Sequence, residues 1–307
     1  MAPRLALALR LAGTGAGVAW IATHVDLASA SDAIGRISIA ALAGAVALVA
    51  ANVVVGALRW GVLLHAYGAA RVPALPRLVR LYFVAFFYNN YLPGAVTGDV
   101  ARAVVTRDAF ADAGATGSLA VVLVERALGL FGLFALLAVG LGVAADGLQG
   151  AGSLWWWTAI GVAGSFAIVI AIPLARRIAP VLPRRLGELA GKLPQLHDAR
   201  AFAVAVLLSI ATQALVALAG WLLLAALAPI GVGDSLLVVP LAAATAFLPI
   251  TVGGAGAREA VYVELCGRLF GMPDGDALAA SLTLWFAHLA VGAIGGAIQL
   301  ASRDRAA

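Results

Sequence analysis

The sequence predicts an all-α polytopic membrane protein, with six transmembrane helices and two re-entrant helical hairpins that together form an inverted-topology repeat. The first observation is composition: of the 307 residues, 63% are hydrophobic, only 11% are charged, and the mean hydropathy is +1.02. A soluble domain carries about 25% charged and about 45–50% apolar residues, so no soluble core would bury this much apolar surface. The single cysteine, Cys266, excludes an internal disulfide framework.

The second observation is a set of six apolar stretches with about the 20 residues that a helix needs to cross the hydrocarbon core of a bilayer. We expect one transmembrane helix in each of residues 5–23, 37–64, 116–145, 153–175, 201–228 and 277–301. The whole chain, residues 1–307, is therefore predicted to be a single integral membrane domain.

The third observation concerns two further apolar stretches, residues 78–109 and 235–270, each of which is interrupted near its middle. The interruptions, residues 92–99 and 248–256, contain the proline and glycine residues that end a helix and let the chain reverse direction. Neither half of either stretch is long enough to span a bilayer. Each stretch is therefore predicted to be a re-entrant hairpin, whose tip must be surrounded by protein or by a wet cavity.

The distribution of basic residues predicts the orientation, because cytoplasmic loops of membrane proteins are enriched in lysine and arginine. Five arginines and one lysine fall within residues 176–200, which we expect to form a cytoplasmic loop. Counting spans from this loop places both termini on the cytoplasmic side of the cell inner (cytoplasmic) membrane and residues 155–157, all tryptophan, at its outer interface. The first hairpin then opens to the cytoplasm and the second to the exterior. Topology thus explains the net charge of +5 better than nucleic-acid binding does.

The two interruptions resemble each other. At a constant offset of 156 residues, the pattern L-P-x-x-V-x-G-x-x-A-R occurs at residues 92–102 and again at residues 248–258, without a gap. Because the flanking spans run in opposite orientations, this pattern predicts an inverted repeat of about residues 38–145 and 201–301, as in many transporters. The alternative is a chance similarity between two re-entrant loops.

The hairpins place two arginines beside two helix ends. Each second half-helix is predicted to begin near Gly98 or Gly254, and its N-terminus combines unpaired N–H groups with the positive end of the helix dipole. Arg102 and Arg258 follow about one turn later. Guanidiniums and helix ends together suit an anion, most simply a phosphate. We therefore hypothesise that both arginines converge on one substrate-binding site near the bilayer midplane.

Local pairing is the alternative for these arginines. Arg102 lies three residues after Asp99, and Arg258 directly precedes Glu259. In this alternative each acidic residue neutralises its arginine, and the arginine has a structural role. In the shared site, by contrast, Glu259 is a candidate for the residue that neutralises a substrate-binding arginine.

Two more charged residues, Glu125 and Arg126, lie well inside the predicted span 116–145. Intramembrane charges are costly and mark functional sites by default. Glu125 is a candidate counter-ion or proton carrier, and the alternative is an ion pair that joins two helices. Asn89, Asn90 and Tyr91, just before the first interruption, are expected to cap freed carbonyls or to contact a headgroup. Arg59, near the inner end of the second span, is expected to snorkel to the interface, and the alternative is that it lines a pathway.

The sequence contains no Walker A motif, no G-x-S-x-G, no H-E-x-x-H and no metal-ligand spacing among its four histidines. We therefore predict no ATPase or hydrolase activity, no cofactor and no metal site. A metal-dependent glycosyltransferase acting on a lipid-linked substrate could use Asp274 and Asp276, together with Asp32. A short Pro-Asp-Gly-Asp turn is more commonly a polar loop.

Four pieces of the sequence carry a family resemblance. They are Arg59-Trp60, Asn90-x-Leu92-Pro93-Gly94-x-x-x-Gly98-Asp99-x-x-Arg102, Glu125-Arg126-x-x-Gly129 and Pro249-x-x-x-Gly253-Gly254-x-Gly256-x-Arg258-Glu259. With these pieces the sequence resembles the flippase-like membrane family related to the transmembrane domain of lysylphosphatidylglycerol synthase. The resemblance covers nearly the whole chain, and Thr97 departs from it, because the family usually has a glycine there.

The resemblance implies movement of a lipid between leaflets, or a role in lipid or glycolipid processing. In bifunctional members an aminoacyl transferase follows the membrane part, and because this sequence ends at Ala307 we do not expect that activity. The predicted function is translocation of an anionic lipid or lipid-linked headgroup by a protein that is not an enzyme. The alternative functions are those of a membrane glycosyltransferase and of a non-catalytic partner of a lipid-modifying enzyme. The sequence also leaves open whether the protein forms a homo-oligomer.

Overall fold

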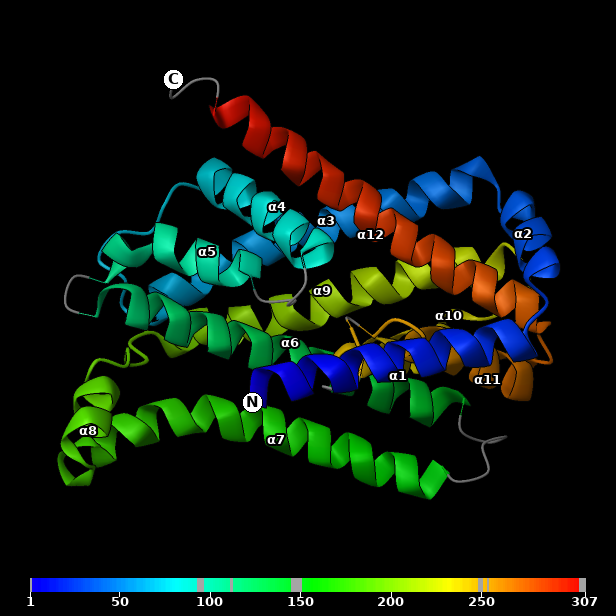
Figure 1. The fold of residues 1–307 in the computed structure, drawn as a ribbon. Coiled ribbons are helices and arrows are strands. Elements are labelled where there is room, and N and C mark those ends of the chain that lie inside the picture. Colours follow the sequence, from blue (N-terminus) through cyan, green and yellow to red (C-terminus); the bar gives the residue numbers. More distant parts are fainter. Residues whose placement is uncertain are drawn as a thin grey trace. The chain divides into compact units, whose positions relative to one another are not determined.

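The computed structural model describes residues 2–92, 97–110, 113–144, 151–247, 251–252 and 254–303, and within these residues it contains helices and no strands (Figure 1). The α-helices are α1 (Ala2–His24), α2 (Leu27–Arg36), α3 (Ile39–Ala66), α4 (Leu75–Tyr91), α5 (Thr97–Val105), α6 (Gly114–Ala144), α7 (Ala151–Ile178), α8 (Arg184–Gly191), α9 (Ala199–Ala225), α10 (Val232–Ala244), α11 (Ala257–Phe270) and α12 (Asp274–Arg303). Short 3-10 turns are η1 (Arg107–Ala109), η3 (Ala179–Val181) and η4 (Thr245–Phe247).

Five of the described helices are long and apolar enough to cross a membrane: α3, α6, α7, α9 and α12. They cover five of the six predicted spans, which confirms the prediction of an all-α multi-pass membrane protein. The sixth predicted span, residues 5–23, lies within α1, which is helical but is not among these five. A count of six spans therefore stays a prediction.

Both interrupted stretches fold as a pair of short helices. The first pair is α4, of 17 residues, and α5, of 9 residues, which runs back alongside α4 (Figure 1). The second pair is α10, of 13 residues, and α11, of 14 residues, and these two helices also contact each other. Residues 93–96, 248–250 and 253 of the predicted tips lie outside the described residues. Insertion of each pair from one face of the membrane remains a prediction.

The close packing of α5 on α4 depends on Gly98. Gly98, Asp99, Arg102 and Ala103 form the buried face of α5, with the spacing of one side of a helix. A Cβ atom on Gly98 would overlap the backbone of Ala85, in the middle of α4. Glycine therefore lets the two backbones approach, as small residues do between membrane helices.

Gly98→Ala is expected to lower the stability of the protein by about 1–3 kcal/mol, because the Ala85 backbone is not free to move as the tip of a side chain would be. The measurement is the apparent unfolding temperature in detergent. Gly164→Ala on α7 is the matched control, since a Cβ there meets nothing within 4 Å. Equal unfolding temperatures for the two variants would show that Gly98 is not needed for this packing.

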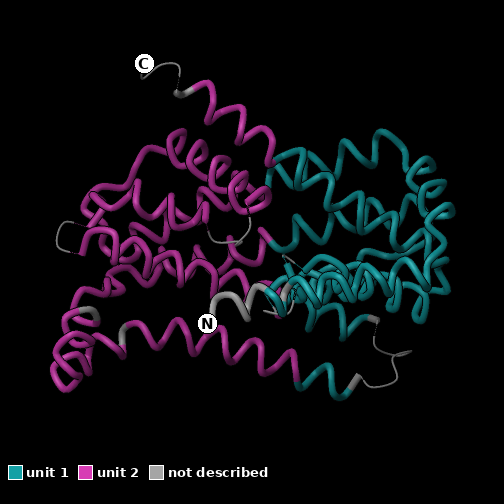
Figure 2. Tube along the Cα trace, in the orientation of Figure 1, with its two compact units in different colours: residues 1–51, 135–156, 213–291 teal, residues 52–134, 157–212, 292–307 magenta. Residues whose placement is uncertain are grey.

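The described chain divides into two compact units (Figure 2). Unit 1 comprises residues 1–51, 135–156 and 213–291, and unit 2 comprises residues 52–134, 157–212 and 292–307. Each unit holds one short helix pair, α10 and α11 in unit 1 and α4 and α5 in unit 2. The long helices α3, α6, α9 and α12 each contribute one part to each unit.

This division has the symmetry that the predicted repeat requires. The repeat pairs α3 with α9, α4 with α10, α5 with α11 and α6 with α12. The C-terminal part of α3 lies in unit 2, and the C-terminal part of its counterpart α9 lies in unit 1. Likewise, the N-terminal part of α6 lies in unit 2, and the N-terminal part of α12 lies in unit 1. The inverted repeat of residues 38–145 and 201–301 stays a prediction.

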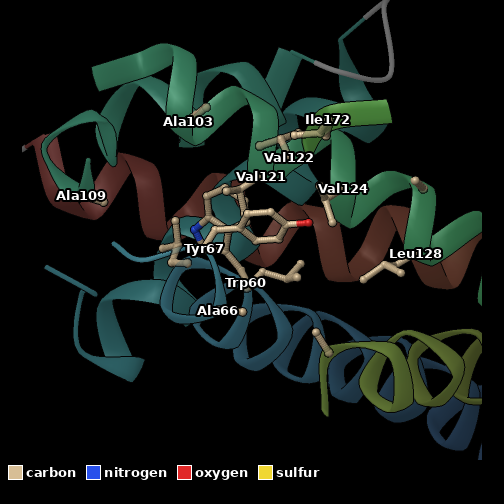
Figure 3. Close-up of a cluster of buried hydrophobic side chains, with 14 of the residues drawn as sticks. Trp60, Ala66, Tyr67, Ala103, Ala109, Val121, Val122, Val124, Leu128 and Ile172 are labelled. Carbon is tan, nitrogen blue, oxygen red and sulfur yellow. The ribbon is translucent and has the colours of Figure 1, made fainter. Parts of the chain in front are cut away.

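The core of unit 2 is a cluster of buried apolar side chains from α3, α6 and the segments around them. Trp60 and Tyr67 lie in the middle of this cluster, surrounded by small and branched residues such as Val121 and Val124 (Figure 3). Trp60 is fully buried. The cluster fixes the inner faces of α3 and α6, and those faces carry the charged residues described next.

Candidate functional site: a buried charge cluster in unit 2

Four helices of unit 2 bring together a set of charged and aromatic side chains that is enclosed by apolar residues. We name this set the charge cluster. It consists of Arg59 from α3, Tyr82 from α4, Asp99 and Arg102 from α5, and Glu125 and Arg126 from α6.

Glu125 is the centre of the charge cluster. Its Oε2 atom accepts a hydrogen bond of 2.6 Å from Arg102, and its Oε1 atom accepts bonds from Arg59 (3.1 Å) and from the Tyr82 hydroxyl (2.8 Å). Only 2% of its side chain is exposed. Three donors around one buried carboxylate match the ionised form, so this arrangement favours the interpretation of Glu125 as a counter-ion over that of a proton carrier.

Asp99 is the second carboxylate and joins two arginines. Its Oδ1 atom accepts a bond of 3.0 Å from Arg102, three residues later on the same helix. Its Oδ2 atom accepts from both Nε (2.9 Å) and Nη2 (2.6 Å) of Arg126. The Arg126 side chain is 33% exposed, whereas that of Arg102 is 2% exposed. Arg126 therefore forms the accessible edge of the charge cluster.

Aromatic rings cover the guanidinium of Arg102. Its Cζ atom lies 4.2 Å from the centre of the Trp60 ring and 4.4 Å from that of Tyr82. A desolvated cation over an aromatic face gains about 2 kcal/mol or more. Trp60 and Tyr82 thus replace part of the hydration that Arg102 loses when it is buried.

The charge cluster is not neutral. Three guanidiniums face two carboxylates, which leaves a formal charge of +1 with Tyr82 protonated. Within the described residues, the buried Nε and Nη1 atoms of Arg102 and the Nε atom of Arg59 have no hydrogen-bond partner. A net positive, donor-rich group in an apolar environment is stabilised by an additional anion.

The N-terminus of α5 is capped from α4. The backbone N–H of Gly98 donates to the side-chain Oδ1 of Asn89, at 2.9 Å. Asn90 instead donates to the carbonyl of Phe86 in its own helix. The expected contact of Asn90 with the freed carbonyls of the break is therefore absent within the described residues, and its neighbour Asn89 serves the start of α5.

Unit 1 contains the second predicted arginine, in a simpler setting. The Nε and Nη2 atoms of Arg258 both donate to the Oε1 atom of Glu259, and the distance from Nε to Oε1 is 2.9 Å. The other oxygen of Glu259 accepts from the N–H of Gly256 at 2.7 Å and so caps α11. An apolar pocket of about 260 Å³, lined by side chains such as Leu278 and Trp285, adjoins this pair.

The start of α11 differs from the prediction. A start near Gly254 was expected, but α11 begins at Ala257. Gly254 and Gly256 have φ angles of +82° and +84°, which lie in the left-handed region and are incompatible with helix. Arg258 is consequently in the first turn of α11, whereas Arg102 is in the second turn of α5.

The structure thus gathers Asp99, Arg102, Glu125 and Arg126 into one site and places Gly98 next to it. Both local pairs that were the alternative, Arg102 with Asp99 and Arg258 with Glu259, are present. Arg102 belongs to unit 2 and Arg258, with Glu259 and Gly254, to unit 1. Convergence of the two arginines on one ligand therefore stays a prediction.

The prediction for Arg59 was wrong. Arg59 does not snorkel: it is 7% exposed and donates to Glu125 and to the hydroxyls of Ser209 and Thr212 on α9. Ser209 and Thr212 are spaced i, i+3 within an apolar span, so they share a helix face. This polar pair was the signal in the sequence for a buried partner on a neighbouring helix. Tyr82 carried no comparable signal.

The fold and the site define a multi-pass α-helical membrane protein with buried charges in its interior. A family model, described as the lysylphosphatidylglycerol synthase TM region, matches residues 5–296. The chain therefore belongs to this family, as the resemblance predicted. No match to the chain was found among curated proteins.

Proposed function

We propose that this protein translocates an anionic lipid, or a lipid-linked anionic headgroup, across the cytoplasmic membrane, with both of its termini on the cytoplasmic side. Family membership supports the coarser statement that the chain is a membrane protein related to lipid synthesis or translocation. The observation that carries the finer proposal is the charge cluster, a buried group of formal charge +1 that reaches an accessible edge at Arg126.

The chemistry of exchange follows from the pairing. A lipid phosphate that approaches Arg126 competes with Asp99 for the same two guanidinium N–H groups, because both oxyanions accept in the same geometry. The net charge favours the phosphate, since its single negative charge neutralises the cluster. An anionic headgroup thereby gains a charge-compensated position inside an otherwise apolar helix bundle, where a charge without partners would be costly.

The glycosyltransferase alternative has less support from the described residues. Asp276, one of its three candidate carboxylates, forms an ion pair with Arg36. No group of three or more histidine, cysteine, aspartate or glutamate side chains that could hold a metal ion occurs in the described part of the chain.

The test is lipid movement in vesicles that contain the purified protein. We expect phosphatidylglycerol labelled on one leaflet to move to the other at least about tenfold faster than phosphatidylcholine with the same chains. One additional charge-assisted hydrogen bond, about 1.5–3 kcal/mol, corresponds to this factor or more. Protein-free vesicles are the control. Equal rates for the two lipids, or rates equal to those of protein-free vesicles, would refute the proposal.

A further inference from the structure

A second pocket lies within unit 2 and shares no residue with the charge cluster. Its volume is about 320 Å³, within the range of about 300–1,000 Å³ that is usual for small-molecule sites. It is formed where the segment after α3, the segment before α6, the end of α7 and the segment between α8 and α9 meet. The last two segments belong to residues 176–200, the predicted cytoplasmic loop.

Backbone hydrogen bonds hold the walls of this pocket together. The N–H of Ala70 donates to the carbonyl of Ala109, and the N–H of His197 donates to the carbonyl of Ala66, both at 2.8 Å. Tyr67, beside them, is buried and packs edge-on against Phe202. Three segments that are distant in the sequence are thus tied to one another, and the pocket is formed before any ligand binds.

The pocket is basic. Arg176 and Lys192 contribute to its lining, and among the described residues no aspartate or glutamate does. Lys192 makes no ion pair among the described residues. Arg176 uses one of its five guanidinium N–H groups on the carbonyl of Leu193, which holds the side chain against the wall.

The carboxylate that follows the lining residue His197 is committed elsewhere. Asp198 accepts hydrogen bonds from the N–H groups of Ala201 and Arg200 at the start of α9, and it pairs with His65. The bond from Ala201 is the main reason that the pKa of Asp198 is below its ordinary value. Asp198 is therefore an ionised helix cap and is not the counter-ion of the pocket.

The remaining lining suits an amphiphilic anion. Tyr67 and Phe110 add buried aromatic surface beside the basic side chains. Burial raises the pKa of Tyr67 to about 12, so its hydroxyl remains protonated at neutral pH. Positive charge, apolar surface and a protonated hydroxyl are what a phosphate ester with an organic substituent requires.

We infer that this basic pocket binds a phosphate group, carried either by the headgroup of an anionic phospholipid or by a free phosphate compound. The inference does not depend on the proposed transport, because the pocket and the charge cluster have no residue in common. Binding here would stand even if no lipid were translocated.

The test measures binding to the purified full-length protein in an uncharged detergent. The probes are inorganic phosphate and a short-chain phosphatidylglycerol, with phosphatidylcholine of the same chain length as comparator. We expect Lys192→Ala to weaken binding of the anionic probe at this pocket about tenfold and Lys192→Glu to weaken it further, because one charge-assisted contact is lost or becomes repulsive. Lys192 is exposed, so both variants should keep the unfolding temperature of the wild type.

Two controls make the result specific. Arg184→Ala removes a basic residue of the same predicted loop that pairs with Glu188 outside the pocket, and it should leave binding unchanged. Arg268→Ala removes an exposed arginine that pairs with Glu264 and lines neither this pocket nor the charge cluster, and it should also leave this binding unchanged. If inorganic phosphate does not displace the bound phosphatidylglycerol, the pocket is a site for a lipid headgroup. If inorganic phosphate displaces it, the pocket is a site for free phosphate compounds. Failure of both probes to bind, or equal losses for Lys192→Ala and Arg184→Ala, would overturn the inference.

Discussion

Glu125→Ala should destabilise the protein by about 3–5 kcal/mol, the largest loss we expect from any single exchange in the charge cluster. Glu125 is fully enclosed and neutralises two buried guanidiniums, those of Arg59 and Arg102. Removing one partner of a buried ion pair leaves uncompensated charge in a low-dielectric interior, which costs about this much. The measurement is the apparent unfolding temperature and the yield of folded protein in detergent.

Two comparisons separate this effect from a general loss of charge. Glu188→Ala also removes a glutamate that pairs with an arginine, but this pair is exposed and should matter by less than about 1 kcal/mol. The double variant Glu125→Leu and Arg59→Met removes one anion and one cation together, so it should recover part of the lost stability. If Glu125→Ala unfolds at the wild-type temperature, Glu125 is not the centre of a stabilising network.

The composition of the buried site was largely predictable, because a charge inside an apolar span has few ways to be compensated. Glu125 and Arg126 stood out in span 116–145, and Arg102 stood out after a break. Sequence position gives the depth of a residue along a helix, but it does not give the helix that faces it. For this reason the position of Arg59 was read as interfacial, whereas α9 places Ser209 and Thr212 against its guanidinium.

The helix ends show a second limit of the sequence. The matching pattern at residues 92–102 and 248–258 predicted two equivalent half-helices. Positive φ angles at Gly254 and Gly256 delay the second one to Ala257, while the first begins at Thr97. Thr97 is the residue that departs from the family pattern, and a glycine there would have made the two breaks more alike.

The two halves of the predicted repeat differ in their charges. At the offset of 156 residues, Arg102 corresponds to Arg258, but Asp99 corresponds to Ala255 and Glu125 to Ser281. The second arginine therefore lacks the acidic partners of the first and pairs with its own neighbour. Within the described residues the hydroxyl of Ser281 is buried without a hydrogen-bond partner. The two arginines at matching positions of the sequence pattern therefore have different local partners.

Arg126→Ala should reduce translocation of phosphatidylglycerol at least about tenfold while the protein keeps its stability within about 1 kcal/mol. Asp99 would retain Arg102 as its partner, so no buried charge is left unpaired. The charge cluster would change from +1 to neutral and lose its accessible guanidinium. Arg126→Lys should be only partly active, since lysine keeps the charge but lacks the planar fork that donates two N–H groups to one oxyanion.

The control for this exchange is Arg268→Ala, which removes an exposed arginine paired with Glu264 and should translocate as the wild type does. The same assay tests whether Arg258 belongs to the site of Arg126. Arg258→Ala should also impair transport, and if both arginines hold one phosphate, the double variant should lose little more than either single variant, because coupled residues are not additive. Losses that multiply would assign the arginines to separate sites, and wild-type rates for Arg126→Ala would remove the charge cluster from the transport mechanism.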